Sequence, residues 1–256
     1  MKVILSFTTI PPRFKYIQSY IENLKNIDNY KEIWINIPKK YNRFPDWDGK
    51  FPYTDFGVNV IINRDCDDLG PGTSAFAPII NGTNADILIV VNDDTIYPKH
   101  MITHLLDSFL REGSKSVWGL SGFNFETYFK GQYPRSHVDP PVDVLEAYGS
   151  CLYKTEWLSK IVDEFKELSH ITWNDDMLIS NLLEKHGIKR RTVFTRECNL
   201  GQLKQLEYGF DENALHHIAA KETGTDVANH TLNNMLILRN FEAIDKKYFS
   251  YEPSSI

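Results

Sequence analysis

Short apolar runs mark the strands that we expect in the first half of the chain. These runs are Val3 to Phe7, Glu32 to Ile37, Val58 to Ile62 and Asp86 to Val91. The last run reads Asp-Ile-Leu-Ile-Val-Val and is the most apolar of the four. Its β-branched residues predict a strand that is buried on both faces, at the centre of a parallel sheet.

Helices are expected between these strands. Pro12 lies where a helix could begin, and the apolar residues after it recur at helical spacing. Further helices are predicted over Ser74 to Ile80 and from Pro98 onward. This alternation predicts an α/β fold, with a mostly parallel, twisted sheet and helices on both faces. Ligands of such sheets bind beyond the carboxyl ends of the strands, which singles out residues 8–13, 63–73 and 92–95.

The second half of the chain is less regular. Strands are predicted over Ser116 to Ser121, Val142 to Tyr148 and Arg191 to Thr195, and helices over Thr155 to Leu168 and Trp173 to His186. Gly187 follows the last helix in the position of a C-cap. Two segments lack a period: Pro38 to Asp55 predicts a long surface loop, and Asn199 to His230 predicts a flexible lid or tail. No repeat or linker divides the chain, so we expect one domain over residues 1–256.

Composition narrows the class of protein. The 256 residues carry a formal net charge of −6, and a nucleic-acid binder would show a basic surplus instead. Cys66, Cys151 and Cys198 lie far apart without metal-ligand spacing, which fits a reducing compartment and argues against a disulfide framework. No apolar run reaches the roughly 18 residues of a transmembrane segment, and the N-terminal run is too short for a signal peptide. We therefore expect a cytoplasmic protein, or the soluble part of something larger.

The acidic turn Asn92-Asp93-Asp94-Thr95 follows directly on the predicted central strand. Carboxylates at this point face the ligand crevice, and hard oxygen ligands of this kind suit Mg²⁺ or Mn²⁺. Such a cation would neutralise a diphosphate. The alternative is a polar strand-to-helix turn, because Asp and Asn are common caps.

Two other segments could bind a nucleotide. Thr8, Thr9 and Arg13 follow the first strand, where hydroxyls, backbone N–H groups and a forked guanidinium can hold phosphate. A helix entry with a surface arginine is the alternative. The loop of residues 63–73 contains Arg64, Asp68 and Gly70, whose polar groups could contact ribose or a base. A charged surface turn would explain that loop equally well.

A second acidic pair, Asp175 and Asp176, opens a predicted helix. The helix dipole favours acids in a first turn, which is a sufficient structural reason for them. A carboxylate here could also take a proton from an acceptor hydroxyl.

These motifs resemble those of the GT-A glycosyltransferases, in particular family-2-like and viral or bacterial capsular-type members with a DxD-type metal motif. The resemblance covers roughly residues 1–190 and rests on Ser6 to Arg13, Asp68 to Thr73 and Val91 to Pro98. It implies a GT-A (Rossmann-like) fold and a nucleotide-binding half over about 1–115. It also implies an acceptor-binding half over about 116–256.

The resemblance also implies roles for single residues. Asp94 would be the direct metal ligand and Asp93 its neighbour toward the donor, while Asn92 stands where many relatives have a first Asp. Asp176 would be the base, with Asp175 beside it. Gly149 would belong to the loop that shapes the donor-sugar pocket; a strand interrupted by a bulge is the alternative. A C-terminal histidine would complete the metal site. His216 is a candidate, as are His217 and His230.

The sequence thus predicts an enzyme that transfers a sugar from a nucleotide diphosphate sugar, expected to be a UDP-sugar, to a glycan or other hydroxyl acceptor. Its cofactor would be Mn²⁺ or Mg²⁺. Two alternatives stay open. One is a metal-dependent nucleotidyltransferase or phosphohydrolase, and the other is a noncatalytic carbohydrate- or nucleotide-binding module.

Overall fold

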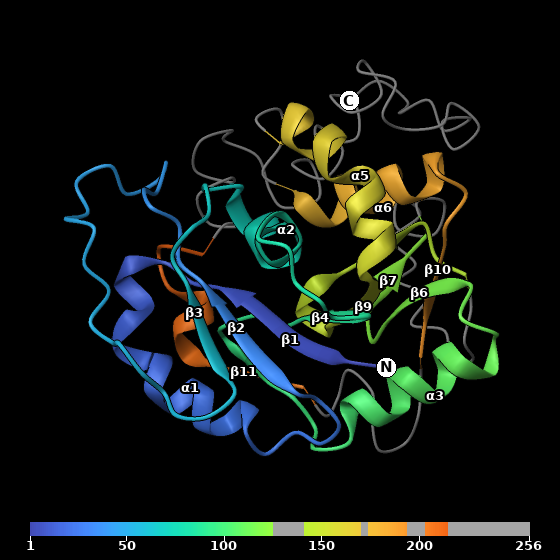
Figure 1. Ribbon diagram of the computed structural model, residues 1–256, viewed down its shortest axis with the longest axis horizontal. Coiled ribbons are helices and arrows are strands. Elements are labelled where there is room, and N and C mark those ends of the chain that lie inside the picture. The colour runs from blue at the N-terminus through green and yellow to red at the C-terminus, as the bar shows by residue number, and fades with distance from the viewer. Residues whose placement is uncertain (125–140, 170–173, 194–202, 215–256) are drawn as a thin grey trace, which may run out of the picture.

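A seven-stranded sheet forms the centre of the computed structural model, which describes residues 1–124, 141–169, 174–193 and 203–214. Its strand order is β10-β6-β9-β4-β1-β2-β3 (Figure 1). The strands are β1 (Val3–Thr8), β2 (Glu32–Asn36), β3 (Val60–Asn63), β4 (Ile87–Val90), β6 (Ser116–Gly119), β9 (Cys151–Lys154) and β10 (Lys189–Thr192). All four residues of β4 are buried, as its continuous apolar run predicts.

The predicted mostly parallel sheet is confirmed, with one antiparallel strand. β9 lies between β4 and β6 and runs antiparallel to both, while the other neighbouring pairs are parallel. The strand expected over Val142 to Tyr148 is wrong as a single element. It divides into β8 (Val144–Leu145), which pairs with β7 (Gly122–Phe123), and the 3-10 turn η3 (Ala147–Gly149).

Helices cover both faces of the sheet (Figure 1), as predicted. α2 (Thr73–Ile80), α5 (Thr155–Leu168) and α6 (Asp175–Lys185) lie on one face, and α1 (Ile17–Leu24) and α3 (Met101–Arg111) on the other. The helix expected from Pro98 begins three residues later, at Met101. Short 3-10 segments η1 (Pro11–Tyr16) and η2 (Gly70–Gly72) precede α1 and α2. In the described parts of the chain, no helix is both long enough and apolar enough to cross a membrane.

The order in which strands are added to the sheet reverses at β1. From β1 it proceeds to β2 and β3 on one side, and then crosses to β4 on the other. Ser6 of β1 lies opposite Val90 of β4, so these parallel strands end side by side. A crevice forms outside the carboxyl ends of strands at such a reversal, which makes this edge the expected ligand site.

The segment predicted as a surface loop, Pro38 to Asp55, contributes an aromatic cluster. Its rings pack edge to face on Phe14 of η1, with centroids 4.9 Å away at Phe51 and 5.8 Å away at Trp47. The cluster consists of Phe14, Tyr41, Phe44, Trp47, Phe51, Tyr53 and Phe56. Edge-to-face pairs stabilise beyond the area they bury. The loop therefore fixes η1, the segment that carries Arg13.

The segment Asn199 to His230, predicted to be a flexible lid or tail, is described by the structure over residues 203–214. Residues 203–214, which we call the strap, contain β11 (Lys204–Gln205) and the 3-10 turn η5 (Glu207–Phe210). β11 pairs antiparallel with β5 (Thr95–Ile96), immediately after the acidic turn. The partners of this pairing lie far apart in the chain, so the local pattern gave no signal.

Candidate functional site

The acidic turn, residues 92–95, is held at its first residue by two buried tyrosines. The Asn92 N–H group donates to Tyr97 Oη at 2.9 Å, and the Tyr20 hydroxyl donates to the Asn92 carbonyl oxygen. Tyr20 lies on α1 and Tyr97 follows β5, so elements on two sides fix the backbone here. The backbone of the turn is therefore held by two hydrogen bonds in addition to the contacts of its carboxylates.

Asp93 is buried, and both of its carboxylate oxygens are occupied. Oδ2 accepts the Thr9 hydroxyl at 2.6 Å, and Oδ1 accepts Arg13 Nη1 at 2.7 Å. Burial raises the pKa of Asp93, and the Arg13 charge opposes this shift. The structure thus joins the predicted residues Thr9, Arg13 and Asp93 at the edge between β1 and β4.

Arg13 is a buried counter-ion of the acidic turn. Only 8% of it is exposed, which rules out the alternative of a surface arginine. Nη1 also lies 3.2 Å from Asp94 Oδ2, and Nε is buried without a hydrogen-bond partner. Burial pulls the pKa of Arg13 down, but the charges of Asp93 and Asp94 outweigh it and raise the pKa. One arginine therefore balances two carboxylates.

Replacing Arg13 with methionine is expected to destabilise the fold. Loss of one partner leaves Asp93 and Asp94 buried without a counter-ion, which costs about 3 kcal/mol and lowers Tm by about 6–12 °C. The loss should grow as pH rises, because burial raises the pKa of Asp93 to about 6, so this carboxyl group carries more negative charge at pH 8 than at pH 5. Thermal denaturation at pH 5 and pH 8 measures this. Lys15→Met removes an exposed cation of the same segment and should leave Tm unchanged.

The strap covers the acidic turn. Leu206 N donates to the Asp94 carbonyl oxygen at 2.6 Å, and the Tyr208 hydroxyl donates to the Asp93 carbonyl oxygen at 2.7 Å. Tyr208 also stacks on Tyr16, with ring centroids 4.1 Å apart. Gly209 lies so close that a Cβ atom there would be 2.9 Å from Asp94 Oδ2. Asp93 and Asp94 are consequently only 6% and 8% exposed.

The two aspartates differ in how well they fit a divalent cation. Both oxygens of Asp93 already accept hydrogen bonds of 2.6–2.7 Å. Those of Asp94 make longer contacts, 3.2 Å to Arg13 and 3.2 Å to the Thr95 hydroxyl. Within the described residues, no group of three or more His, Cys, Asp and Glu side chains is arranged to hold a metal. Asp94 therefore fits as a ligand better than Asp93 does, and the candidate ligand His216 lies outside the described residues.

The second acidic pair opens α6 as predicted. The Asn174 side chain caps the helix by accepting from Met177 N at 2.9 Å, and Asp176 Oδ1 accepts from Ala147 N at 3.0 Å. Burial raises the pKa of Asp175 to about 7. The pKa of Asp176 is also raised, first by burial and then by the charge of Asp175. Such a carboxyl group is a stronger base at neutral pH than an exposed one.

These shifts predict that stability falls as pH rises. Folded Asp175 keeps a proton up to about pH 7, whereas an unfolded Asp releases it near pH 4. Between these values the folded chain binds more protons, so the free energy of unfolding decreases with pH. Asp175→Asn should be more stable than wild type by about 1–2 kcal/mol at pH 8, several degrees in Tm, and no more stable at pH 4. A pH series of melting curves tests this, and parallel curves would contradict it.

The predicted glycine loop, residues 146–151, contacts Asp176 through its backbone, because Ala147 N donates to Asp176 Oδ1. A Cβ atom at Gly149 would lie 2.5 Å from Ser121 Cβ and 2.7 Å from Ser121 N, so glycine is required by this contact within the chain. Ser150 adopts φ +64°, and its hydroxyl donates to the Val90 carbonyl oxygen at 2.9 Å. The loop is thereby anchored to the end of β4.

The remaining predicted nucleotide contacts are engaged with neighbouring loops. The Thr8 hydroxyl donates to the Asn36 carbonyl oxygen at 2.9 Å. Arg64 donates to the Gly49 carbonyl oxygen at 2.9 Å and lies over the Trp47 ring. Asp68 accepts from Asn42 N at 2.7 Å and from Gly70 N at 3.0 Å, and Gly70 adopts φ +62°. Arg64, Asp68 and Gly70 thus shape the loop after β3, whereas Thr8 ends β1 next to Thr9.

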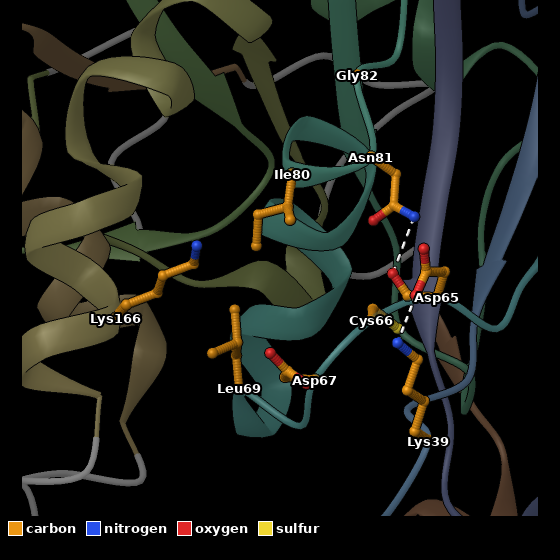
Figure 2. Close-up of a pocket in the computed structure, with 9 residues that line it drawn as sticks. All are labelled: Lys39, Asp65, Cys66, Asp67, Leu69, Ile80, Asn81, Gly82 and Lys166. Atoms are coloured by element: carbon orange, nitrogen blue, oxygen red, sulfur yellow. Dashed lines mark hydrogen bonds and ion pairs between the residues drawn. The ribbon is translucent and has the colours of Figure 1, made fainter.

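A polar hollow of about 530 Å³ lies behind the same loop (Figure 2). Lys39 pairs with Asp65 at 2.5 Å on one side, and Lys166 of α5 faces the hollow from the other. No residue of the acidic turn lines it. The hollow is therefore distinct from the place where Asp93 and Asp94 lie.

No family model matches the chain, and no curated protein does. Solved structures of S. aureus TarS have a similar fold. TarS 1–349 superposes with a TM-score of 0.51 at 13% identity, over 100% of this chain and 74% of that one. TarS 1–349 in complex with UDP gives 0.49 at 14% identity over the same shares. For a longer TarS structure the TM-score is 0.49 at 14% sequence identity. That match covers 99% of this chain and 44% of the TarS chain. At 13% identity, the likeness to TarS 1–349 with the TM-score of 0.51 shows a shared α/β fold of GT-A type and nothing finer.

Tyr97, Tyr208 and Gly209 were not predicted as parts of the site. Tyr97 stood within the motif Val91 to Pro98, but nothing in the local pattern shows that its hydroxyl turns back to Asn92. Tyr208 reaches Asp93 from 115 residues away. Only a three-dimensional structure brings such partners together.

Proposed function

We propose that the protein transfers a sugar from a nucleotide diphosphate sugar, a UDP-sugar in the first instance, to a hydroxyl of a glycan or similar acceptor. One observation carries the proposal: the acidic turn lies at the carboxyl end of β4, beside the end of β1, in a sheet of GT-A type. That edge is where ligands bind in open α/β sheets.

Asp94 would hold Mn²⁺ or Mg²⁺, which supplies positive charge to the leaving diphosphate. Arg13 supports the same role, since its Nε is buried without a partner and a phosphate oxygen could accept from it. If the charge of Asp94 were neutralised, its attraction for Arg13 Nη1 would weaken, and the guanidinium would be free to turn toward the diphosphate.

Asp176 would act as the base. In the proposed step, the acceptor hydroxyl oxygen forms a bond to the anomeric carbon while the bond from that carbon to the diphosphate oxygen breaks. The hydroxyl proton passes to an Asp176 oxygen, and the electron pair leaves with the diphosphate. The raised pKa of Asp176 suits this transfer.

The proposal requires the strap to move. Gly209 packs on the Asp94 carboxylate, so a cation and a diphosphate reach that oxygen only after residues 203–214 shift. The shift breaks the hydrogen bonds of Leu206 and Tyr208 to the acidic turn. Ligand contacts must replace these bonds.

A thermal-shift experiment with UDP, with and without MnCl₂, tests the proposal. A ligand at about 100 times its Kd stabilises the folded state by about 2.7 kcal/mol, or roughly 5–10 °C in Tm. We expect that shift with UDP and Mn²⁺ together, and little with either alone. GDP, UTP and free sugars complete the panel. A larger shift with UTP would favour a nucleotidyltransferase, and no shift with any nucleotide would contradict the proposal.

One observation favours the alternative of a noncatalytic nucleotide-binding module. Arg13 already balances much of the charge of Asp93 and Asp94, as in a site that has no need of a metal. Release of UDP from UDP-glucose, UDP-galactose and UDP-N-acetylglucosamine separates the two functions. A module would bind UDP without EDTA-sensitive release from any of the three.

We also propose a reducing compartment, such as the cytoplasm, as the place where the protein works. Cys66 and Cys151 are both buried and unbridged, which supports this.

A further inference from the structure

We propose that Tyr97 is a positioning residue that sets the distance between the acidic turn and the candidate base Asp176. This inference rests on the proposed function. Its basis is a series of hydrogen bonds that runs from Asn92 through Tyr97 and the loop at Tyr148 to Asp176. In this series the Tyr97 hydroxyl joins the two halves of the site, which are the acidic turn and the glycine loop with Asp176.

On the acidic side, the Tyr97 hydroxyl accepts the Asn92 N–H at 2.9 Å. Asn92 immediately precedes Asp93, so a shift of its peptide group moves both carboxylates. Tyr97 is 6% exposed, and water cannot readily take the place of its hydroxyl. Leaving the buried Asn92 N–H group without a partner would cost free energy, so its hydrogen bond to Tyr97 is favoured.

On the other side, the same hydroxyl donates to the Tyr148 carbonyl oxygen at 3.2 Å. Tyr148 belongs to η3, and the preceding residue, Ala147, donates its N–H to Asp176 Oδ1 at 3.0 Å. A change in the position of this turn therefore reaches the carboxylate that would take the proton.

The glycine loop is braced by contacts with Ser121. The Ser121 hydroxyl donates to Glu146 Oε2 at 2.5 Å and lies 3.1 Å from Tyr148 Oη. Gly149 packs directly on Ser121. Because these contacts tie the loop residues together, the hydrogen bond between Tyr97 and Tyr148 links the whole loop to the acidic turn.

Each half of the site has its own supports without Tyr97. Asp93 keeps Thr9 and Arg13, and Asp176 keeps Ala147. Loss of the Tyr97 hydroxyl should therefore leave nucleotide binding nearly intact. It should impair sugar transfer, which needs the acidic turn and Asp176 at the correct distance from each other. A purely structural role would instead affect binding and turnover alike.

Tyr97→Phe tests the inference by two measurements on the full chain. The first measurement gives two constants for the variant and for wild type: the Kd of UDP in the presence of MnCl₂, and kcat for UDP release from the three UDP-sugars. We expect Kd within about threefold of wild type and kcat lower by roughly 10- to 100-fold, the range for a reacting group misplaced by up to about an ångström. The second is hydrogen exchange in peptides over residues 88–97 and 141–154. Both should lose protection, because Asn92 and Ala147 share one anchored path.

Thr155→Val is the matched control. It removes a hydroxyl that donates to the Ala85 carbonyl oxygen at 2.7 Å, at the amino end of β4 and away from the site. It should alter neither kcat nor the two peptides. For Tyr97→Phe, unchanged exchange over 141–154, or a parallel loss of Kd and kcat, overturns the inference. Should wild type bind no UDP, the proposed function fails, while the exchange result still decides whether Tyr97 joins the two segments.

Discussion

Replacing Asp94 with asparagine is expected to lower UDP release from a UDP-sugar by roughly 100- to 1000-fold, the cost of losing one preorganised electrostatic group. Asparagine keeps the shape of the side chain but removes the charge that would hold the cation. The fold should survive, because Asp93 and Asp94 repel each other and Arg13 is left with one partner at 2.7 Å. Steady-state rates with and without MnCl₂ measure the effect.

Asp86→Asn is the control for that experiment. Asp86 precedes β4, at the other end of the same strand, and its 61% exposed side chain accepts from Lys2 N. This variant should release UDP at the wild-type rate. If Asp94→Asn also retains that rate, Asp94 does not anchor a metal and the proposed function loses its main support.

Replacing Asp176 with asparagine should lower sugar transfer by about 10²- to 10⁴-fold, the usual contribution of a general base. The Asn174 cap on α6 remains in this variant, so the helix should still form. UDP affinity should be unchanged, because Asp94 and Arg13 are untouched. The measurement is kcat together with Kd for UDP.

The pH dependence of kcat gives a further check on Asp176. Since its pKa is raised by burial and by Asp175, wild-type turnover should increase with pH until the carboxyl group has lost its proton. That increase should be absent from the residual rate of Asp176→Asn. Asp163→Asn, an exposed acid on α5, should behave as wild type. Equal rates in Asp176→Asn and wild type would remove this residue from the mechanism.

The sheet and its helices could be predicted because their signals are local. The apolar run at β4 and the helical spacing in α5 are properties of neighbouring residues, and α5 begins and ends where predicted. The place of β9 between β4 and β6 could not be predicted, since a strand's sequence does not state its neighbours.

For the site, the sequence could identify which residues have suitable side chains for binding a nucleotide and a cation, but not which of those side chains contact one another. The rule that ligands bind at strand ends correctly brought Thr9, Arg13 and Asp93 to one edge. It could not show that Arg13 turns inward to those carboxylates, because that depends on where Phe14 and its aromatic neighbours pack. The strap was missed for the same reason.

The central place of β9 has a consequence for biosynthesis. During translation, β1 to β4 and β6 are synthesised before residues 151–154, so β4 and β6 each have an unpaired edge until β9 has followed them out of the ribosome. Bare edges of this kind recruit other strands, and nascent chains are exposed to such pairing. The sheet can become continuous only when the late strand enters between two early ones. The halves at about 1–115 and 116–256 thus share one sheet, and separately expressed fragments would each lack a neighbour.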